Sequence, residues 1–304
     1  MLVGIDFGAT TIKGALVTTD GVVVRRGTMP TEGSKGPPGV IDDIAALIAE
    51  LATGVTIDGV GIGVCGMVDR HRGIVLYTTD TLPGWRDVPL SNELEHRTGV
   101  RCVCDNDGNA AVLGEYLVGQ RETISHLVTF TLGTGVGGGI VVNREVVRGA
   151  AYLAGHLGHI KVRAGGRMCA CGARGCLEAY ASAYAIRRTM HQEPVEVFAA
   201  AERGDVVAKK AVSEMADALG RAFGSLSCIL NPECIVICGG ISKGWHLLEA
   251  EALASFAKYA LPGAASTPVV VSALGENTGV VGAAMLCLEA SQFPNDPADI
   301  SRNK

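Results

Sequence analysis

Three cysteines stand close together in the middle of the chain, at Cys169, Cys171 and Cys176, with glycines between and beside them. Two histidines, His156 and His159, come shortly before. Three thiolates and one imidazole complete a tetrahedral zinc site, and four protein ligands make such a site closed and structural. The alternative is a set of three unrelated reduced thiols, which the close spacing disfavours.

A run of polar residues, Asp105, Asn106 and Asp107, follows an expected strand and leads into an expected helix. In open α/β sheets this edge is where ligands bind, and a carboxylate there is placed for general acid–base chemistry. The other interpretation is that Asp107 only caps the helix. The residues alone leave both interpretations open.

An internal repeat aligns Leu2–Val17 with Leu127–Val142 without a gap, at an offset of 125 residues. Each copy consists of an apolar strand, a tight Gly/Thr turn and a second apolar strand. Glycine turns expose backbone N–H groups without side-chain obstruction, so two of them can hold one polyanionic ligand. The repeat therefore indicates a duplicated domain that binds phosphate.

Other phosphate motifs fit less well. Gly133-x-Gly135-x-x-Gly138 matches the dinucleotide fingerprint, but it leads into an apolar strand instead of a helix. A Walker A loop is excluded because the chain contains no Gly-Lys dipeptide. A third glycine turn, Gly239-Gly240, is either an ordinary strand-to-helix turn or a place where the backbone approaches a flat ligand such as adenine.

The elements that must position these residues alternate between strands and helices, which is typical of an α/β protein. The stretch 66–85 is expected to be irregular. Strands are expected at 2–7, 12–18, 22–26, 59–65, 100–104, 234–238 and 268–272. Helices are expected at 41–51, 91–97, 178–190, 206–230, 246–259 and 279–290, and a further helix is expected to follow Asn109 and end at Leu117.

Composition excludes several classes of protein. The 304 residues correspond to about two domains, and a net charge of −5 without a basic block argues against nucleic acid as a partner. The uncharged stretch 123–143 contains five glycines, so we expect strand-turn-strand and no membrane partner. Ten cysteines in a chain that starts without a signal peptide predict reduced thiols and a cytoplasmic location.

Taken together, the motifs resemble the ROK family of sugar kinases and sugar-responsive repressors. The resemblance extends from residue 2 to about 290, and its motifs occur in the family's order. They are Asp6-Phe-Gly-Ala-Thr-Thr11, Asn106-Asp107-x-Asn109-Ala-Ala, Leu132-Gly-Thr-Gly-Val-Gly-Gly-Gly-Ile140, Gly155-x-x-Gly158-His159 and Cys169-x-Cys-Gly-x-x-Gly-Cys-x-Glu178.

The resemblance implies an actin/hexokinase-like (ribonuclease H-like) duplicated fold, with two α/β domains around a cleft. The first domain would span residues 1–118, with a C-terminal helix at about 279–304 packing back on it, and the larger second domain would span 119–278. The implied cofactors are ATP, Mg²⁺ and a structural Zn²⁺, in a homodimer or homotetramer.

The implied activity is that of an ATP:hexose 6-phosphotransferase, with Asp107 as the general base for the 6-hydroxyl. This favours catalysis over capping for Asp107. The sugar would be bound by Asn106, His156, His159, Glu178, Gly66 and Thr81. ATP and Mg²⁺ would be bound by Asp6, Gly8, Thr10, Thr11, Lys13, Gly133, Thr134, Gly135, Gly137, Gly239 and Gly240. Zinc would be bound by His159, Cys169, Cys171 and Cys176.

The sugar itself is less well defined, because two positions depart from the glucose-type pattern. His156 stands where those members usually have Glu, and the stretch around Thr81 also differs. We expect a glucose-type hexose first, with N-acetylmannosamine or another N-acetylhexosamine as the alternative. A sugar-responsive regulator of the same family is disfavoured, because no DNA-binding domain precedes the first strand.

Overall fold

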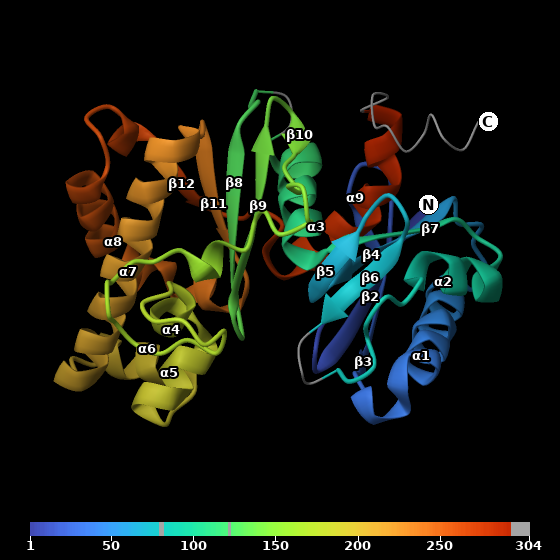
Figure 1. The fold of residues 1–304 in the computed structure, drawn as a ribbon, viewed down its shortest axis with the longest axis horizontal. Coiled ribbons are helices and arrows are strands. Elements are labelled where there is room, and N and C mark those ends of the chain that lie inside the picture. The colour runs from blue at the N-terminus through green and yellow to red at the C-terminus, as the bar shows by residue number, and fades with distance from the viewer. Residues whose placement is uncertain (79–81, 121–122, 293–304) are drawn as a thin grey trace. The chain divides into compact units, whose positions relative to one another are not determined.

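The computed structural model describes residues 1–78, 82–120 and 123–292 (Figure 1). The chain forms two compact units. The first contains Met1–Glu122, Glu145–Ala154 and Asn277–Lys304, and the second contains Thr123–Arg144 and Gly155–Glu276. The sequence predicts one continuous stretch, 119–278, for the second domain, whereas Glu145–Ala154 belongs to the first unit.

The first unit is built on a five-stranded sheet of order β3-β2-β1-β4-β7. Strand β1 is antiparallel to β2, whereas β1, β4 and β7 are mutually parallel. The carboxyl ends of β1, β4 and β7 therefore lie at one edge of the sheet. The strands are β1 (Leu2–Phe7), β2 (Thr11–Val17), β3 (Val23–Pro30), β4 (Gly59–Val64) and β7 (Cys102–Asn106).

Alternation along the strands gives the sheet two different faces. One face carries large apolar residues, Ile5 among them, which form the core together with α1 (Gly36–Leu51) and α2 (Leu90–Thr98). On the other face, which packs against α3 (Asp107–Gly114) and α9 (Thr278–Gln292), β1 and β4 carry glycines. A π-helical turn, Glu115–Gln120, continues α3. A 3₁₀ turn (Gly33–Lys35) and the hairpin β5 (Gly66–Asp69) and β6 (Ile74–Thr78) complete the unit.

Helix α9 approaches the sheet at backbone distance because those glycines have no side chains. A Cβ atom at Gly61 would lie 1.7 Å from the carbonyl oxygen of Ala283, and one at Gly4 would lie 1.9 Å from that of Val280. Only glycine fits at such a contact. The final helix is thus held directly over β1 and β4.

The second unit repeats this topology. Its sheet has the order β10-β9-β8-β11-β12, with β8 antiparallel to β9 and parallel to β11. The strands are β8 (Leu127–Leu132), β9 (Val136–Val142), β10 (Glu145–Val146), β11 (Cys234–Cys238) and β12 (Val269–Val271). The strand pair β8–β9 lies 125 residues after β1–β2, as the repeat predicts.

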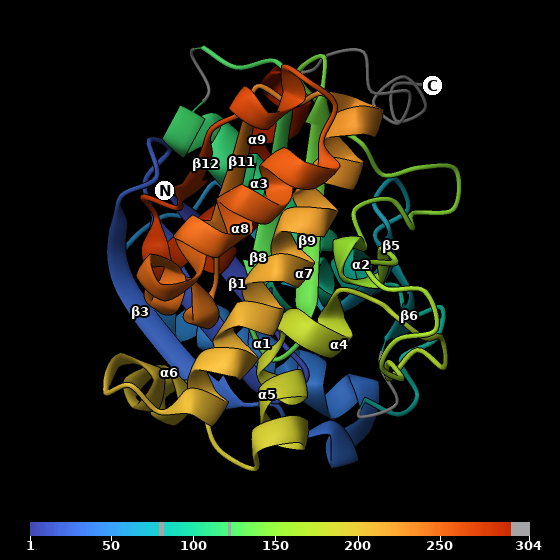
Figure 2. The ribbon, with the colours of Figure 1, turned by 90° about the vertical axis from the view of Figure 1, so that its left-hand side faces the viewer.

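Helices α7 (Val206–Leu230) and α8 (Trp245–Tyr259) cover one face of this second sheet (Figure 2). Phe223 of α7 packs edge-on against Phe130 of β8 and Phe256 of α8, with ring centroids 5.2 and 6.0 Å apart. The remaining elements of the chain are α4 (Glu178–Ala181), α5 (Ala183–Met190), α6 (Pro194–Glu202) and four 3₁₀ turns at Leu157–His159, Gly240–Gly244, Ala264–Ser266 and Gly275–Asn277.

Three predictions of secondary structure are wrong in detail. The helix expected over 178–190 is broken at Ser182, whose hydroxyl donates to the Glu178 carbonyl and accepts from the Ala185 N–H. The stretch 66–85, expected to be irregular, contains the hairpin β5–β6. Helix α6 was not expected, although Glu193 and Glu196 form a capping box there and Pro194 occupies its first turn.

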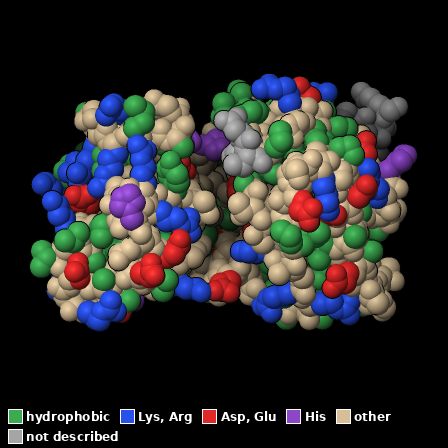
Figure 3. Space-filling model, turned by 90° about the horizontal axis from the view of Figure 1, so that it is seen from below, with side chains coloured by type: hydrophobic (Ala, Val, Ile, Leu, Met, Phe, Trp, Pro, Cys, Tyr) green, Lys and Arg blue, Asp and Glu red, His purple; other side chains and the backbone are tan. Residues whose placement is uncertain are grey.

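The surface carries both signs of charge. On the visible face of the first unit, acidic and basic side chains are interspersed (Figure 3). Within the described part of the chain, no helix has the length and apolar character needed to cross a membrane.

We expect Gly61→Ala to lower the free energy of unfolding by about 3 kcal/mol, the upper end of overpacking costs, because the new methyl group would meet the backbone carbonyl oxygen of Ala283. The control is Gly59→Ala on the same strand, where the nearest atom is the Cys287 sulfur at 3.1 Å. Urea unfolding measures both. Equal losses in the two variants would show that α9 adjusts and that its close approach is not a constraint.

Candidate functional site

The edge formed by the carboxyl ends of β1, β4 and β7 brings together three segments that are distant in sequence. The turn Gly8–Thr11 follows β1, Gly66 comes shortly after β4, and Asn106 and Asp107 lie at the junction of β7 and α3. Parallel strands meet at this edge, which is where open α/β sheets bind ligands. Of the sugar residues expected in this unit, Thr81 lies outside the described residues.

The cap of α3 is Asn106, not Asp107. The Asn106 Oδ1 atom accepts from the N–H groups of Gly108 (2.9 Å) and Asn109 (3.3 Å). Its Nδ2 donates to the Gly66 carbonyl and to Asp107 Oδ1, both at 2.9 Å. The interpretation of Asp107 as the capping residue is therefore wrong, and its second carboxylate oxygen is left out of these contacts.

Asp107 has an unusual electrostatic environment. Burial, and after it the negative charge of Asp6, raise the pKa of Asp107 to about 7 against the opposing effect of hydrogen bonds from Gly108 and Asn106. A carboxyl group with a pKa near 7 is poised to take up a proton at neutral pH. This is the behaviour required of a general base.

Gly63 lies between the strand that carries Asp6 and the start of α3. Asp6, Gly63 and Asp105 lie side by side on β1, β4 and β7. A Cβ atom at Gly63 would lie 3.4 Å from the Cα of Asp107, so the start of α3 rests directly on this position. Burial also raises the pKa of Asp6, and the charge of Lys13 on the paired strand opposes that rise.

The two glycine turns of the repeat are similar in detail. Gly8 N donates to Thr11 O at 3.1 Å in the first turn, and Gly133 N donates to Gly135 O at 3.0 Å in the second. Within the part of the chain that the structure describes, the N–H groups of the middle residues have no acceptor. These residues are Ala9 and Thr10 in the first turn, and Thr134 and Gly135 in the second. Each turn thus presents N–H groups suited to an anion.

The third glycine turn lies beside the second one. Strands β8 and β11 are parallel neighbours, so the turns that follow them start at the same edge. Gly239 has φ = +90°, and a Cβ atom there would lie 2.5 Å from the Leu132 carbonyl oxygen. Gly240 and Gly133 have open space where a side chain would be, and Gly137 lies against the Thr131 hydroxyl.

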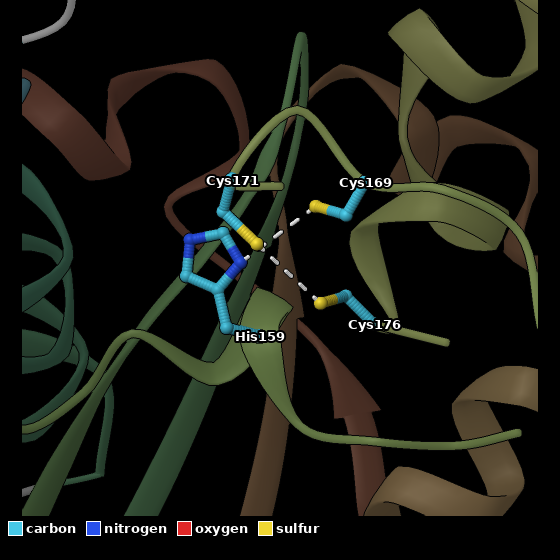
Figure 4. Close-up of side chains that lie close together, drawn as sticks. All are labelled: His159, Cys169, Cys171 and Cys176. Atoms are coloured by element: carbon cyan, nitrogen blue, oxygen red, sulfur yellow. Dashed lines mark hydrogen bonds between the residues drawn. The ribbon is translucent and has the colours of Figure 1, made fainter. Parts of the chain in front are cut away.

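The four residues expected to bind zinc converge in the second unit (Figure 4). Their ligand atoms all lie within 4.8 Å of one another. Cys171 Sγ is 3.7 Å from Cys176 Sγ, and Cys169 Sγ is 3.9 Å from His159 Nδ1. Around a tetrahedral zinc ion with Zn–S bonds of ~2.3 Å, neighbouring ligand atoms are roughly 3.8 Å apart. The residues present therefore fit the ion.

Backbone contacts fold the cysteine loop into this arrangement. Val162 N donates to Gly175 O, and Leu177 N donates to Ile160 O, both at 2.9 Å, so His159 is held near the last cysteine. Gly175 has φ = +80°, and a Cβ atom there would lie 1.8 Å from the Arg163 carbonyl oxygen. Lys161 Nζ donates to Cys176 Sγ at 2.8 Å, a contact that no motif in the sequence indicated.

Glu178 connects the cysteine loop with the second glycine turn. Its Oε2 accepts from Val136 N at 3.0 Å, and its Oε1 lies 3.6 Å from Cys169 Sγ. A Cβ atom at Gly135 would lie 2.5 Å from the same carboxylate, so a side chain there would displace Glu178.

The two histidines lie close together on the other side of this turn. Their rings are 6.4 Å apart between centroids, and Gly158 between them packs against the Val136 carbonyl. Burial and the neighbouring His159 lower the pKa of His156. Both effects favour the neutral form of the His156 imidazole.

The family model described as ROK family matches residues 2–290. The chain belongs to the ROK family. A glucokinase of Thermotoga maritima is 38% identical to this ROK protein over 309 residues, covering 95% of this chain and 97% of the relative. An N-acetylmannosamine kinase of Escherichia coli is 30% identical over 291 residues, covering 93% and 97%.

Solved structures agree with this assignment. A ROK glucokinase from Streptomyces griseus, in complex with glucose and AMPPNP, superimposes with a TM-score of 0.81 at 31% identity, covering 94% of this chain and 98% of that one. This ROK protein thus has the actin/hexokinase-like fold that its motifs predict.

Proposed function

We propose that this ROK protein is an ATP-dependent hexose kinase that phosphorylates the 6-hydroxyl group of a glucose-type aldohexose. The observation that carries the proposal is the Asp107 carboxylate, with its pKa of about 7, beside Asn106 at the carboxyl edge of the first sheet. The glucokinase relatives support ATP and glucose as substrates.

In the first unit, we assign Asn106 and Gly66 to the sugar. Asp107 accepts the proton of the 6-hydroxyl while that oxygen attacks the γ-phosphorus and ADP leaves. The turn Gly8–Thr11 offers N–H groups to phosphate oxygens, with Lys13 nearby. Phosphoryl transfer depends mainly on such positioning and on charge neutralisation.

Asp6 is the residue that we assign to Mg²⁺. Carboxylates are preferred ligands of this ion, and the half-buried, like-charged pair of Asp6 and Asp107 is an environment that a cation would stabilise. When bound, Mg²⁺ neutralises charge on the phosphates. Asp6 orients the ion, and Asp107 holds the proton.

In the second unit, we assign the Gly133–Gly137 turn to phosphate and Gly239-Gly240 to adenosine, since their backbone is unobstructed. Glu178 and the loop containing His156 and His159 are assigned to the sugar. A homodimer or homotetramer in the cytoplasm stays a prediction.

The direct test compares Asp107→Asn with the wild type. We expect turnover to fall by about 10²–10⁴-fold, the usual contribution of a general base, while sugar binding survives because an amide still forms hydrogen bonds.

Wild-type kcat/KM should fall about tenfold per pH unit below pH 7, because protonation of Asp107 removes the base. ADP release from a panel of hexoses and N-acetylhexosamines measures both the activity and the sugar preference.

The control for this test is Asp20→Asn, which removes an exposed carboxylate in the β2–β3 turn. It should leave turnover unchanged. Near wild-type turnover in Asp107→Asn would show that Asp107 is not the base. ADP release with no sugar of the panel would overturn the proposal as a whole.

We also propose one structural zinc ion per chain, bound by His159, Cys169, Cys171 and Cys176. Cys171→Ser should lose the ion and lower both Tm and activity, because loop closure holds Glu178. Cys228→Ser is a matched control, since Cys228 is also an exposed cysteine but lies on α7. Elemental analysis of chelator-washed protein measures the zinc content of each variant. Wild-type protein without stoichiometric metal would contradict the assignment.

A second candidate function is N-acetylmannosamine kinase, which the neutral imidazole of His156 favours. A neutral imidazole offers one donor and one acceptor, so it suits an acetamido carbonyl, whereas the usual Glu accepts from two hydroxyl groups. The E. coli N-acetylmannosamine kinase supports this alternative at lower identity than the glucokinases.

His156→Glu tests the choice of sugar. We expect it to raise kcat/KM for glucose relative to N-acetylmannosamine by about tenfold, because one good hydrogen bond is worth ~1.4 kcal/mol. Steady-state kinetics with both sugars measures the ratio. Equal losses for both would show that His156 supports the loop without selecting the sugar.

A further inference from the structure

Two residues before the proposed base in the chain lies a buried carboxylate, Asp105, with a side chain only 1% exposed. Its Oδ1 atom accepts from the Asn106 N–H (2.7 Å) and from the Asn109 side-chain amide (2.9 Å). These two donors come before and after Asp107 in the chain. The Asp105 carboxylate therefore braces the β7–α3 junction on both sides of the proposed base.

The other oxygen of Asp105 is bound by an arginine from a distant part of the chain. Arg148 Nε donates to Asp105 Oδ2 at 2.7 Å, and the Arg148 side chain is 16% exposed. Arg148 belongs to Glu145–Ala154, the segment by which the chain returns to the first unit. In the same segment Tyr152 donates to Asp69 at 2.8 Å.

Helix α9 completes the arrangement. A second nitrogen of Arg148 donates to both carboxylate oxygens of Glu289 at 2.7 Å. Arg70 donates to Glu289 at 3.3 Å and to the Leu286 carbonyl oxygen at 3.2 Å. Among the described residues, two largely buried arginines thus face two buried carboxylates, and Arg148 is the one that contacts both.

Stability is a weak reason for such a cluster, because well-packed apolar residues are often as stabilising as a buried ion pair. Charged groups add a defined orientation, since one planar guanidinium group fixes the two carboxylates relative to each other. Here the oriented Asp105 carboxylate accepts hydrogen bonds from the Asn106 backbone and the Asn109 side chain, which lie on either side of Asp107 in the chain.

We propose that Arg148 is a positioning residue for phosphoryl transfer, which holds Asp105 and, through Asp105, sets the position of Asn106 and Asp107. The inference rests on the proposed kinase function. A displacement of about 1 Å at reacting groups can cost ~10²-fold in rate, so loss of the brace should act on kcat. It should also act on the KM for the sugar, because Asn106 is assigned to it.

The test compares Arg148→Met with Arg70→Met, the same substitution at two arginines of one cluster, of which only Arg148 contacts Asp105. We expect Arg148→Met to lower kcat by about 10²-fold and raise the sugar KM, with the KM for ATP changed less than twofold. Arg148→Lys should rescue little, because an ammonium group cannot form the fork. Arg70→Met should keep kcat within about threefold even where its Tm falls.

A second readout is independent of turnover. Hydrogen exchange of peptides covering 102–114 should speed up in Arg148→Met and not in Arg70→Met, because the Asn106 N–H loses its oriented acceptor. Asp105→Asn, which keeps an acceptor and the fold, should show an intermediate loss of kcat. Equal kcat and equal exchange in the two methionine variants, or wild-type kcat in Asp105→Asn, would overturn the inference. A wild type that releases no ADP with any sugar, but shows the exchange difference, would instead overturn the proposed function alone.

Discussion

Two carboxylates, Asp6 and Asp107, lie at the edge of the first sheet, where burial opposes the ionisation of both and the charge of Asp6 further opposes that of Asp107. A folded protein retains such a pair only if the surrounding structure holds both members in place. Here the parallel strands β1 and β7 hold them, with Gly63 of β4 between. Burial and the charge of Asp6 together raise the pKa of Asp107 to a value suited to a base, and the two carboxylates form an environment in which a cation is favourable.

Much of the first unit follows from this constraint. Glycines on the same sheet face let α9 and α3 approach at backbone distance, which brings the start of α3 over β4. Asn106 caps α3 and leaves the Asp107 carboxylate available. Asp105, on the neighbouring side, is bound by an arginine, so the like charge that faces Asp107 comes from Asp6 and not from Asp105.

The second unit has the same strand order but offers a different kind of chemical group at the carboxyl edge of its sheet. The groups that we propose for ligand binding in this unit are mostly backbone groups of glycine turns, which carry no net charge. The loop between His159 and Glu178 brings the three cysteines together beside His159. A metal ion bound there would contribute folding energy directly.

The sequence predicted those features that depend on local pattern. The repeat set β8 and β9 at the right residues, and the Cys/His spacing identified the cluster that the structure brings together. The break at Ser182 could not be predicted from periodicity, because it depends on one hydroxyl group that bonds in both directions.

Arg148 was missed for a different reason. Its partners are 43 and 141 residues away, and no motif links such positions. The choice between cap and base for Asp107 likewise depended on which of two adjacent side chains turns back to the helix N-terminus. Sequence spacing does not determine this.

The most direct test of the account is the titration of the Asp107 carboxyl carbon by NMR, in the wild type and in Asp6→Asn. Because the two carboxyl groups are coupled, the pair titrates as a unit. We expect a wild-type apparent pKa of about 7 for Asp107, which falls when Asp6 loses its charge but stays above the ordinary range because the group remains buried. An ordinary pKa in the wild type, or one that does not change in Asp6→Asn, would contradict the claim that burial and the charge of Asp6 together create the base.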